Sequence, residues 1–184
     1  MVAEVTSRDA RFVDLYQEFC GRVDAYCRRR CSAERVDDAV AETFLTAWKK
    51  IDDVPMGEGT LPWLYGVARR VVAHQWRSSS RVDRLRTKLE SLGVATQAPP
   101  DDVVVMDEES VLVLRALSRL KALDQEVLRL SVWEDLNHIE IAQVLNVSHD
   151  VIKKRFSRAK TRLAEEINRL IQEKSPAAQE GGAW

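Results

Sequence analysis

Two stretches of the sequence concentrate cationic side chains in a way that suits binding to phosphate groups. Residues 63–86 contain six arginines and one acid, and residues 148–162 contain six lysines or arginines and one acid. Between them, residues 87–109 contain one lysine and six acids. Such charges bind the phosphates of nucleic acids, but they also occur on solvated helix faces that bind nothing. Because the basic stretch occurs twice, the pattern favours two separate nucleic-acid contacts.

Aromatic residues interleave with the arginines of the first basic stretch. This segment holds Trp63, Tyr65, Arg69, Arg70, Trp76, Arg77 and Arg81. Exposed aromatic rings stack on unpaired bases, and neighbouring arginines neutralise the phosphates. The composition of this segment therefore favours a contact with nucleic acid. A second interpretation stays open for Trp63, which lies just after the predicted start of a helix and would also suit the core.

Three cysteines, Cys20, Cys27 and Cys31, fall on one side of a predicted helix. Such thiols bind zinc or act as a redox switch in some proteins, but free cysteine on an apolar helix face is commonly buried. No histidine lies near enough to complete a four-ligand set, so we expect no metal site and no cofactor. The odd, clustered count argues against a disulfide framework and indicates a reducing cytoplasm.

No catalytic set assembles from the sequence. His74 and His138 are isolated, and the sequence has no phosphate-binding loop, dinucleotide fingerprint, zinc-protease motif or nucleophile elbow. We therefore expect a binding protein and not an enzyme.

The elements that position these residues begin with three helices in the N-terminal half. Apolar residues recur at steps of three and four over residues 7–31 and 33–50, which predicts two helices. Residues 52–60, with Pro55 and two glycines, predict a loop. A third helix follows to about Arg84, with Thr60 as its N-cap and Pro62 in its first turn. Short loops between helices favour a compact bundle.

The 184 residues divide into two small helical domains. Their composition, 45% hydrophobic and 31% charged, is typical of a soluble helical protein, and no run approaches the ~18 apolar residues of a membrane helix. Residues 1–11 carry no secretory signal. Residues 87–109 lose the helical periodicity and indicate a linker. We predict an all-α fold with a first domain at 1–86, an acidic flexible linker at 87–109, a second domain at 110–174 and a disordered tail at 175–184.

The second domain contains the signals of a short helix, a turn and a long helix. Asn137 and Glu140 have the spacing of a capping box, with Asn as the N-cap. The short helix should end near Leu145, and Asn146 suits the left-handed conformation that follows a helix. Ser148 can cap the long helix after it. This order is typical of a helix-turn-helix.

The faces of this motif predict which side binds DNA. Asp124 can cap the preceding helix, and the core of the motif would contain Ile141, Ala142, Leu145, Val147 and Ile152. The opposite face of the long helix offers His149, Lys153, Lys154 and Arg158, and in a helix-turn-helix that helix enters the major groove. The alternative is an ordinary helical hairpin with a basic, solvated face.

Three segments carry a resemblance to a known family. Residues 37–48 read DDAVAETFLTAW, residues 61–77 read LPWLYGVARRVVAHQWR, and residues 120–163 read LKALDQEVLRLSVWEDLNHIEIAQVLNVSHDVIKKRFSRAKTRL. Over nearly its whole length the chain resembles the extracytoplasmic-function (ECF) sigma factors of the bacterial sigma-70 family. The first two segments are similar to region 2 of that family, and the third is similar to region 4.

The resemblance implies a dissociable specificity subunit for transcription initiation. Its partners would be core RNA polymerase, at the beta-prime clamp and beta flap, promoter DNA and an anti-sigma factor, with no insertion into a membrane. The polymerase-binding residues implied are Asp37, Asp38, Glu42 and Phe44. Without the resemblance, these acids would be read as a solvated patch.

The resemblance also implies which residues contact each promoter element. For the −10 element, which must be opened, these are Trp63, Arg69, Arg70, His74, Trp76, Arg77 and Arg81. For the −35 element, they are Ser148, His149, Asp150, Lys153, Lys154, Arg155 and Arg158. The long cationic side chains of Arg155 and Arg158 can instead pack or pair within the domain.

Some residues depart from the usual family pattern, and two other functions remain open. Arg70 and His74 stand where Asn and Asp are common, Val151 and Lys154 stand where Thr and Ser are common, and Asn146 replaces a frequent glycine. The promoter sequence is therefore not transferable. One alternative is a helix-turn-helix regulator that binds palindromic duplex DNA without polymerase. The other is a helical adaptor whose basic faces bind acidic proteins.

Overall fold

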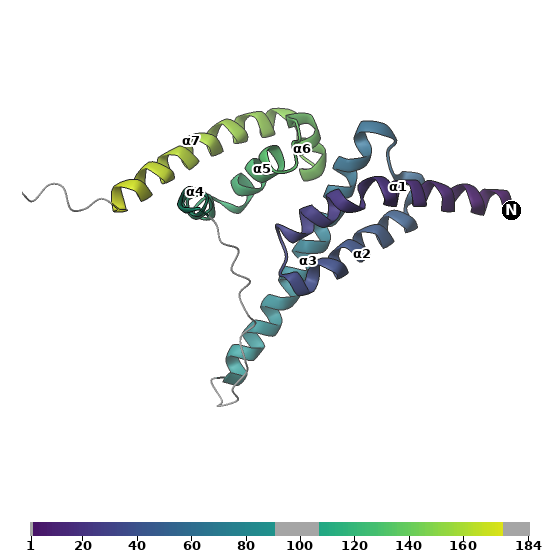
Figure 1. Cartoon of the computed structure of the whole chain (residues 1–184), viewed down its shortest axis with the longest axis horizontal. Helices are drawn as coiled ribbons and strands as arrows, with labels where there is room; N and C mark the ends of the chain where they lie inside the picture. Colours follow the sequence, from purple (N-terminus) through teal and green to yellow (C-terminus); the bar gives the residue numbers. More distant parts are fainter. Residues whose placement is uncertain (1, 91–106, 175–184) are drawn as a thin grey trace, which may run out of the picture. The chain divides into compact units, whose positions relative to one another are not determined.

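The computed structural model describes the backbone of residues 2–90 and 107–174, and the side chains of residues 7–77 and 107–173. These parts are helical and contain no strand, in agreement with the predicted all-α fold. The elements are α1 (Val2–Arg28), α2 (Ala33–Lys49), two 3-10 turns η1 (Ile51–Asp53) and η2 (Gly57–Gly59), α3 (Thr60–Glu90), α4 (Glu108–Ser118), α5 (Ala122–Val132), α6 (His138–Leu145) and α7 (His149–Lys174) (Figure 1). Two compact units result, with α1–α3 in the first and α4, α5 and α7 in the second.

The first unit is a three-helix bundle. Each of α1, α2 and α3 packs against the other two (Figure 1). Val23, Tyr26 and Leu64 are fully buried between them. The rings of Tyr26 and Tyr65 stack with their centroids 5.0 Å apart, which joins α1 to α3. Since burial of each large apolar side chain contributes about 1.5–3 kcal/mol, the apolar stripes of the three helices account for the closure of the bundle.

The loop between α2 and α3 is tied to the bundle on both sides. Ile51 and Val54 of this loop are buried, and Arg11 of α1 donates a hydrogen bond from Nη2 to the carbonyl of Val54 at 2.6 Å. Thr60 does not act as the predicted N-cap: it is the first residue of α3, and its hydroxyl donates to the carbonyl of Pro55 at 2.7 Å. Gly57 has a φ of +68°, a conformation that a residue with a Cβ adopts at a cost.

The second unit is held by α7, which packs against both α4 and α5. Leu117, Leu128 and Ala159 form its buried core with Leu120, and Phe156 lies against this cluster. Asp107 caps the start of α4: its carboxylate accepts from the backbone N–H of Ser110 at 2.7 Å, and this bond lowers the pKa of Asp107. The capping residue of α5 is Lys121, so the predicted cap, Asp124, has another role described below.

The helix ends differ in places from those predicted by the sequence. α3 continues through Glu90 instead of ending near Arg84, so the first residues of the predicted linker are helical. Most of that linker, and the predicted tail at 175–184, lie outside the described residues. In the ranges that are described, no helix is long and apolar enough to cross a bilayer.

Candidate nucleic-acid interface

The start of α6 has the capping box that the sequence predicted. The backbone N–H groups of Ile139 and Glu140 donate to the side-chain oxygen of Asn137 at 2.8 and 3.1 Å. In return, the carboxylate of Glu140 accepts from the backbone N–H of Asn137 at 2.7 Å. Because these bonds satisfy N–H groups that an uncapped helix leaves without partners, they define where α6 begins.

The turn from α6 to α7 also follows the predicted pattern. Asn146 has a φ of +53°, the left-handed conformation expected just after a helix. Ser148 directly precedes α7, and its carbonyl accepts from the backbone N–H groups of Val151 and Ile152. Ile141 and Ile152 are fully buried, but Val147 is 39% exposed and does not join the predicted core. The chain therefore forms a helix-turn-helix with a three-residue turn.

The N-terminal part of α7 exposes a largely basic surface. The residues exposed on it are Ser148, His149, Asp150, Lys153, Lys154 and Arg158. At the tip, the rings of His149 and His138 lie 6.2 Å apart, and His138 packs 4.9 Å from Phe156. Arg155 differs from the others, because it is half-buried and bonded to Asp124 of α5 at 2.7 Å. The second basic stretch therefore presents fewer free cations than its sequence indicates.

The second candidate surface follows α3. Arg70, His74, Trp76 and Arg77 are exposed, and Trp63 and Arg69 are half-buried. Tyr65 is 2% exposed and stacks on Tyr26, so it cannot stack on a base as the sequence suggested. The side chain of Arg81 lies outside the described residues.

Trp76 joins this surface to the turn between α1 and α2. It is 64% exposed and donates a hydrogen bond from Nε1 to the carbonyl of Arg30 at 3.0 Å. Arg35 of α2 donates to the carbonyl of Gln75 at 3.4 Å. The turn at Arg30 and the side chain of Arg35 therefore lie beside α3, and the exposed cation of Arg35 extends the basic surface of α3, which the sequence interpretation missed.

The helix α2 also carries an acidic face. Asp37, Asp38 and Glu42 are exposed, as a surface for a partner requires. Phe44 does not belong to it: it is 3% exposed, and its ring lies 4.8 Å from that of Tyr16. Leu45, which is 51% exposed, is the apolar residue of this face, because positions 38, 42 and 45 share one side of a helix.

The three cysteines occupy different environments. Cys27 is buried, and Cys20 and Cys31 are half-buried. Cys31 lies with its Sγ 3.9 Å from Oε1 of Gln75, and burial raises the pKa of its thiol. Among the side chains that the structure describes, no group of three or more metal-ligating residues comes together. A raised thiol pKa disfavours the reactive thiolate.

Taken together, a helical bundle with an acidic face and a second unit with a basic helix-turn-helix define a class of protein, the two-domain helical DNA-binding proteins of transcription. Family models identify it further: Sigma-70 region 2 matches residues 15–82, and Sigma-70, region 4 matches residues 110–163. The chain belongs to the sigma-70 family and is of its ECF type.

Individual relatives agree with this assignment. The RNA polymerase sigma factor CnrH of Cupriavidus metallidurans is 30% identical over 140 residues, which cover 70% of this chain and 71% of CnrH. The ECF RNA polymerase sigma factor RpoE of Cereibacter sphaeroides is 25% identical over 168 residues, covering 87% and 88% of the two chains. The sigma factor RpoE of Bartonella quintana, solved in complex with the anti-sigma factor NepR, matches with a TM-score of 0.57 and 26% identity, covering 84% of this chain and 97% of that one.

Proposed function

We propose that this chain is a sigma factor that directs bacterial core RNA polymerase to specific promoters and helps to open them. The observation that carries the proposal is the pairing, in one sigma-70 chain, of a capped helix-turn-helix with a basic exposed helix and a bundle with an acidic exposed helix. It acts by binding and not by catalysis. Its partners meet in the cytoplasm, where we place the protein.

Core polymerase would bind the acidic face of α2. Asp37, Asp38 and Glu42 offer carboxylates to cationic side chains of a partner, and Leu45 offers an apolar contact within the same patch. Interfaces of this kind gain affinity from an apolar centre and specificity from the charges around it. The first domain, which we assign to residues 1–86, would therefore carry the polymerase contact, with a further contact from the second domain.

Promoter DNA would bind the two basic surfaces. The exposed residues of α3, with the indole of Trp76 among cations, suit an opened −10 element, since rings stack on unpaired bases. The N-terminal end of α7 suits the −35 duplex. There, Lys153, Lys154 and Arg158 can reach phosphates or guanine edges in the major groove.

An anti-sigma factor would hold the protein inactive by covering one of these surfaces. The Bartonella quintana sigma factor with which this chain shares its fold was solved in complex with such a partner. A carboxylate-rich face and a cation-rich face are both needed for the proposed function, and either is a suitable target.

The test is co-elution of the full chain with bacterial core RNA polymerase, followed by mapping of the transcripts that the complex starts on genomic DNA. A stable complex with a new set of start sites is the expected result and would supply the promoter motif. Tight binding to palindromic duplex DNA without any polymerase complex would instead support the helix-turn-helix regulator. Binding to neither would contradict both DNA-based functions and leave the adaptor.

A further inference from the structure

One buried carboxylate holds two arginines of the DNA-recognition helix. Asp124 of α5 is 1% exposed, and its two oxygens accept hydrogen bonds from different residues of α7. Oδ1 accepts from Nη1 of Arg155 at 2.7 Å, and Oδ2 accepts from Nη1 of Arg162 at 2.6 Å. Charged hydrogen bonds of this length are among the strong ones in proteins, and a buried carboxylate without them would be costly.

The two arginines lie on one side of α7. They are seven residues apart, which is close to two helical turns, so a single carboxylate can span both. Ala159 lies between them in sequence and is fully buried, and its small side chain allows α5 to approach α7 closely. The arginine side chains are 33% and 47% exposed, so their stems lie at the edge of the interface and their charged ends turn toward Asp124.

This arrangement divides the cations of the second basic stretch into two groups. Lys153, Lys154 and Arg158 are exposed. Arg155 and Arg162 are bound to a carboxylate of their own domain. A guanidinium that already pairs with a buried carboxylate gains little by moving to a phosphate, because the carboxylate would lose its partner.

We propose that Asp124 is a specificity-determining positioning residue: it keeps Arg155 and Arg162 away from DNA phosphates and sets the rotation of α7 about its own axis. The inference rests on the proposed function. Phosphate contacts strengthen binding to every sequence alike, whereas contacts to base edges distinguish sequences. By removing two cations from the phosphate-binding set, Asp124 lowers the affinity for every DNA sequence alike. By fixing the rotation of α7, it keeps the exposed residues of that helix aligned with the base edges, and this alignment is the source of its effect on specificity.

The salt dependence of DNA binding measures directly how many phosphate contacts the chain makes. Each phosphate contact adds about 0.9 to the slope of log affinity against log salt concentration on duplex DNA. The Asp124→Asn variant keeps the shape of the side chain but removes its charge and one of its two acceptor oxygens, so at least one of the two arginines loses its partner. Asp135→Asn is the matched control, because it changes the charge by the same amount at an exposed position. Asp135 has a φ of +53°, a conformation that asparagine also adopts.

The full chain is titrated with a duplex of scrambled sequence. We expect the slope for Asp124→Asn to exceed that for Asp135→Asn by as much as about 1.8, which is about a tenfold difference in affinity loss between 50 and 200 mM salt. With core polymerase and the mapped promoter, the preference of Asp124→Asn for the −35 duplex over scrambled DNA should fall. Asp124→Glu, which restores a carboxylate, should recover both the wild-type salt slope and the wild-type preference for the −35 duplex. Equal slopes and equal preferences for Asp124→Asn and Asp135→Asn would overturn the proposal.

A second comparison does not depend on the fold of the Asp124 variant. Arg162→Gln should leave the slope of the wild-type chain unchanged, and Lys154→Gln should lower it by about 0.9. If Arg162→Gln lowers the slope as much as Lys154→Gln does, Arg162 contacts phosphate and the proposal is wrong. Because these titrations use the chain without polymerase, their result stands apart from whether the chain proves to be a sigma factor.

Discussion

Arg11 of α1 donates a hydrogen bond from Nη2 to the backbone carbonyl of Val54, 43 residues further along the chain, at 2.6 Å. Val54 is 3% exposed, and the next residue but one, Met56, is 79% exposed. The bond therefore fixes the loop at the point where it turns from the core toward solvent. This loop leads directly into α3, so the hydrogen bond from α1 helps to fix the position at which the helix of the candidate −10 surface starts.

Replacing Arg11 should loosen the loop that precedes α3. Arg11→Ala leaves the Val54 carbonyl without its donor and should lower the free energy of unfolding by about 1.5 kcal/mol, the usual value for a hydrogen bond to a charged group. Promoter opening, followed by permanganate reactivity of unpaired thymines, should fall while the affinity for core polymerase is retained. Arg8→Ala is the control, since the ion pair of Arg8 with Asp52 is exposed and 3.8 Å long, and its loss should change stability little. Equal effects of the two variants would contradict the role of Arg11.

The acidic face of α2 should determine polymerase affinity. Asp38→Ala combined with Glu42→Ala removes two exposed carboxylates but keeps good helix formers, so the fold should persist. We expect affinity for core polymerase, measured by fluorescence titration, to fall about tenfold, which corresponds to about 1.4 kcal/mol. The same charge change made at Asp9 and Asp14 of α1 should leave affinity nearly unchanged. Loss of affinity in both double variants would point to net charge and not to this face.

The exposed cations of α7 should determine use of the −35 element. Lys153→Ala with Arg158→Ala should reduce transcription from a −35-dependent promoter by about tenfold or more, since each lost base or phosphate contact costs about 1 kcal/mol or more. Lys49→Ala with Lys50→Ala, at the end of α2, makes the same charge change elsewhere. Multiple-round transcription with mapped promoters measures both. Unchanged transcription in the α7 variant would remove these residues from the −35 contact.

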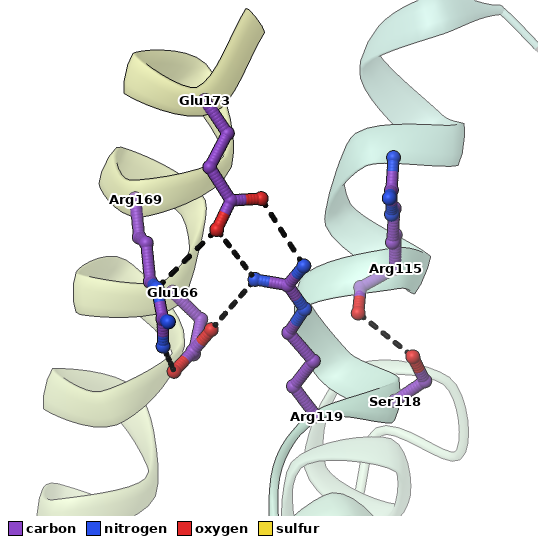
Figure 2. Close-up of polar contacts among 6 residues, drawn as sticks. All are labelled: Arg115, Ser118, Arg119, Glu166, Arg169 and Glu173. Carbon is purple, nitrogen blue, oxygen red and sulfur yellow. Dashed lines mark hydrogen bonds and ion pairs between the residues drawn. The ribbon is translucent and has the colours of Figure 1, made fainter.

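The junction of α4 and α7 should be sensitive to acid. Arg119, at the end of α4, hydrogen-bonds to Glu166 and Glu173 of α7, and Arg169 pairs with the same two carboxylates (Figure 2). The hydrogen bond from Arg119 holds the pKa of Glu173 below its ordinary value of 4.5. Ionised Glu173 therefore stabilises the folded state above that pH, and this contribution is lost as the pH falls through the lowered pKa.

Glu173→Gln should remove this acid-sensitive contribution. Between about pH 5 and pH 3, the free energy of unfolding of the variant should fall less than that of the wild type. Urea denaturation at each pH gives the comparison, and Glu165→Gln, an exposed carboxylate of the same helix, is the control. An identical pH dependence in the wild type and Glu173→Gln would show that the contacts in Figure 2 contribute nothing in solution.

The turn of the helix-turn-helix should respond to substitution at Asn146. With a φ of +53°, this position strains any residue that has an ordinary Cβ and a side chain unable to hydrogen-bond locally. Asn146→Ala should therefore lower the free energy of unfolding by about 1 kcal/mol, and Asn146→Gly should leave it within about 0.5 kcal/mol of the wild type. Chemical denaturation of both variants tests the assignment, which fails if alanine is tolerated as well as glycine.

Much of this protein could be predicted from its sequence because the signals are local. The capping box of Asn137 and Glu140 and the left-handed Asn146 depend on residues within a few positions, and the structure has them as predicted. Apolar periodicity likewise predicted the helices, since a helix exposes one face to the core at fixed steps. The end of α3 was less predictable, because no strong stop signal precedes Glu90.

Tertiary packing decided which of the candidate side chains a partner can reach. Phe44 and Tyr65 have the right residue types for an interface, but contacts with Tyr16 and Tyr26 of another helix bury them. Asp124 has a residue type common at helix starts, yet it pairs with arginines 31 and 38 residues away. The sequence by itself thus determined the helices, the capping box of α6 and the family, which depend on neighbours along the chain. Exposure and charge pairing depend on neighbours in space, so only the packed domains could determine them.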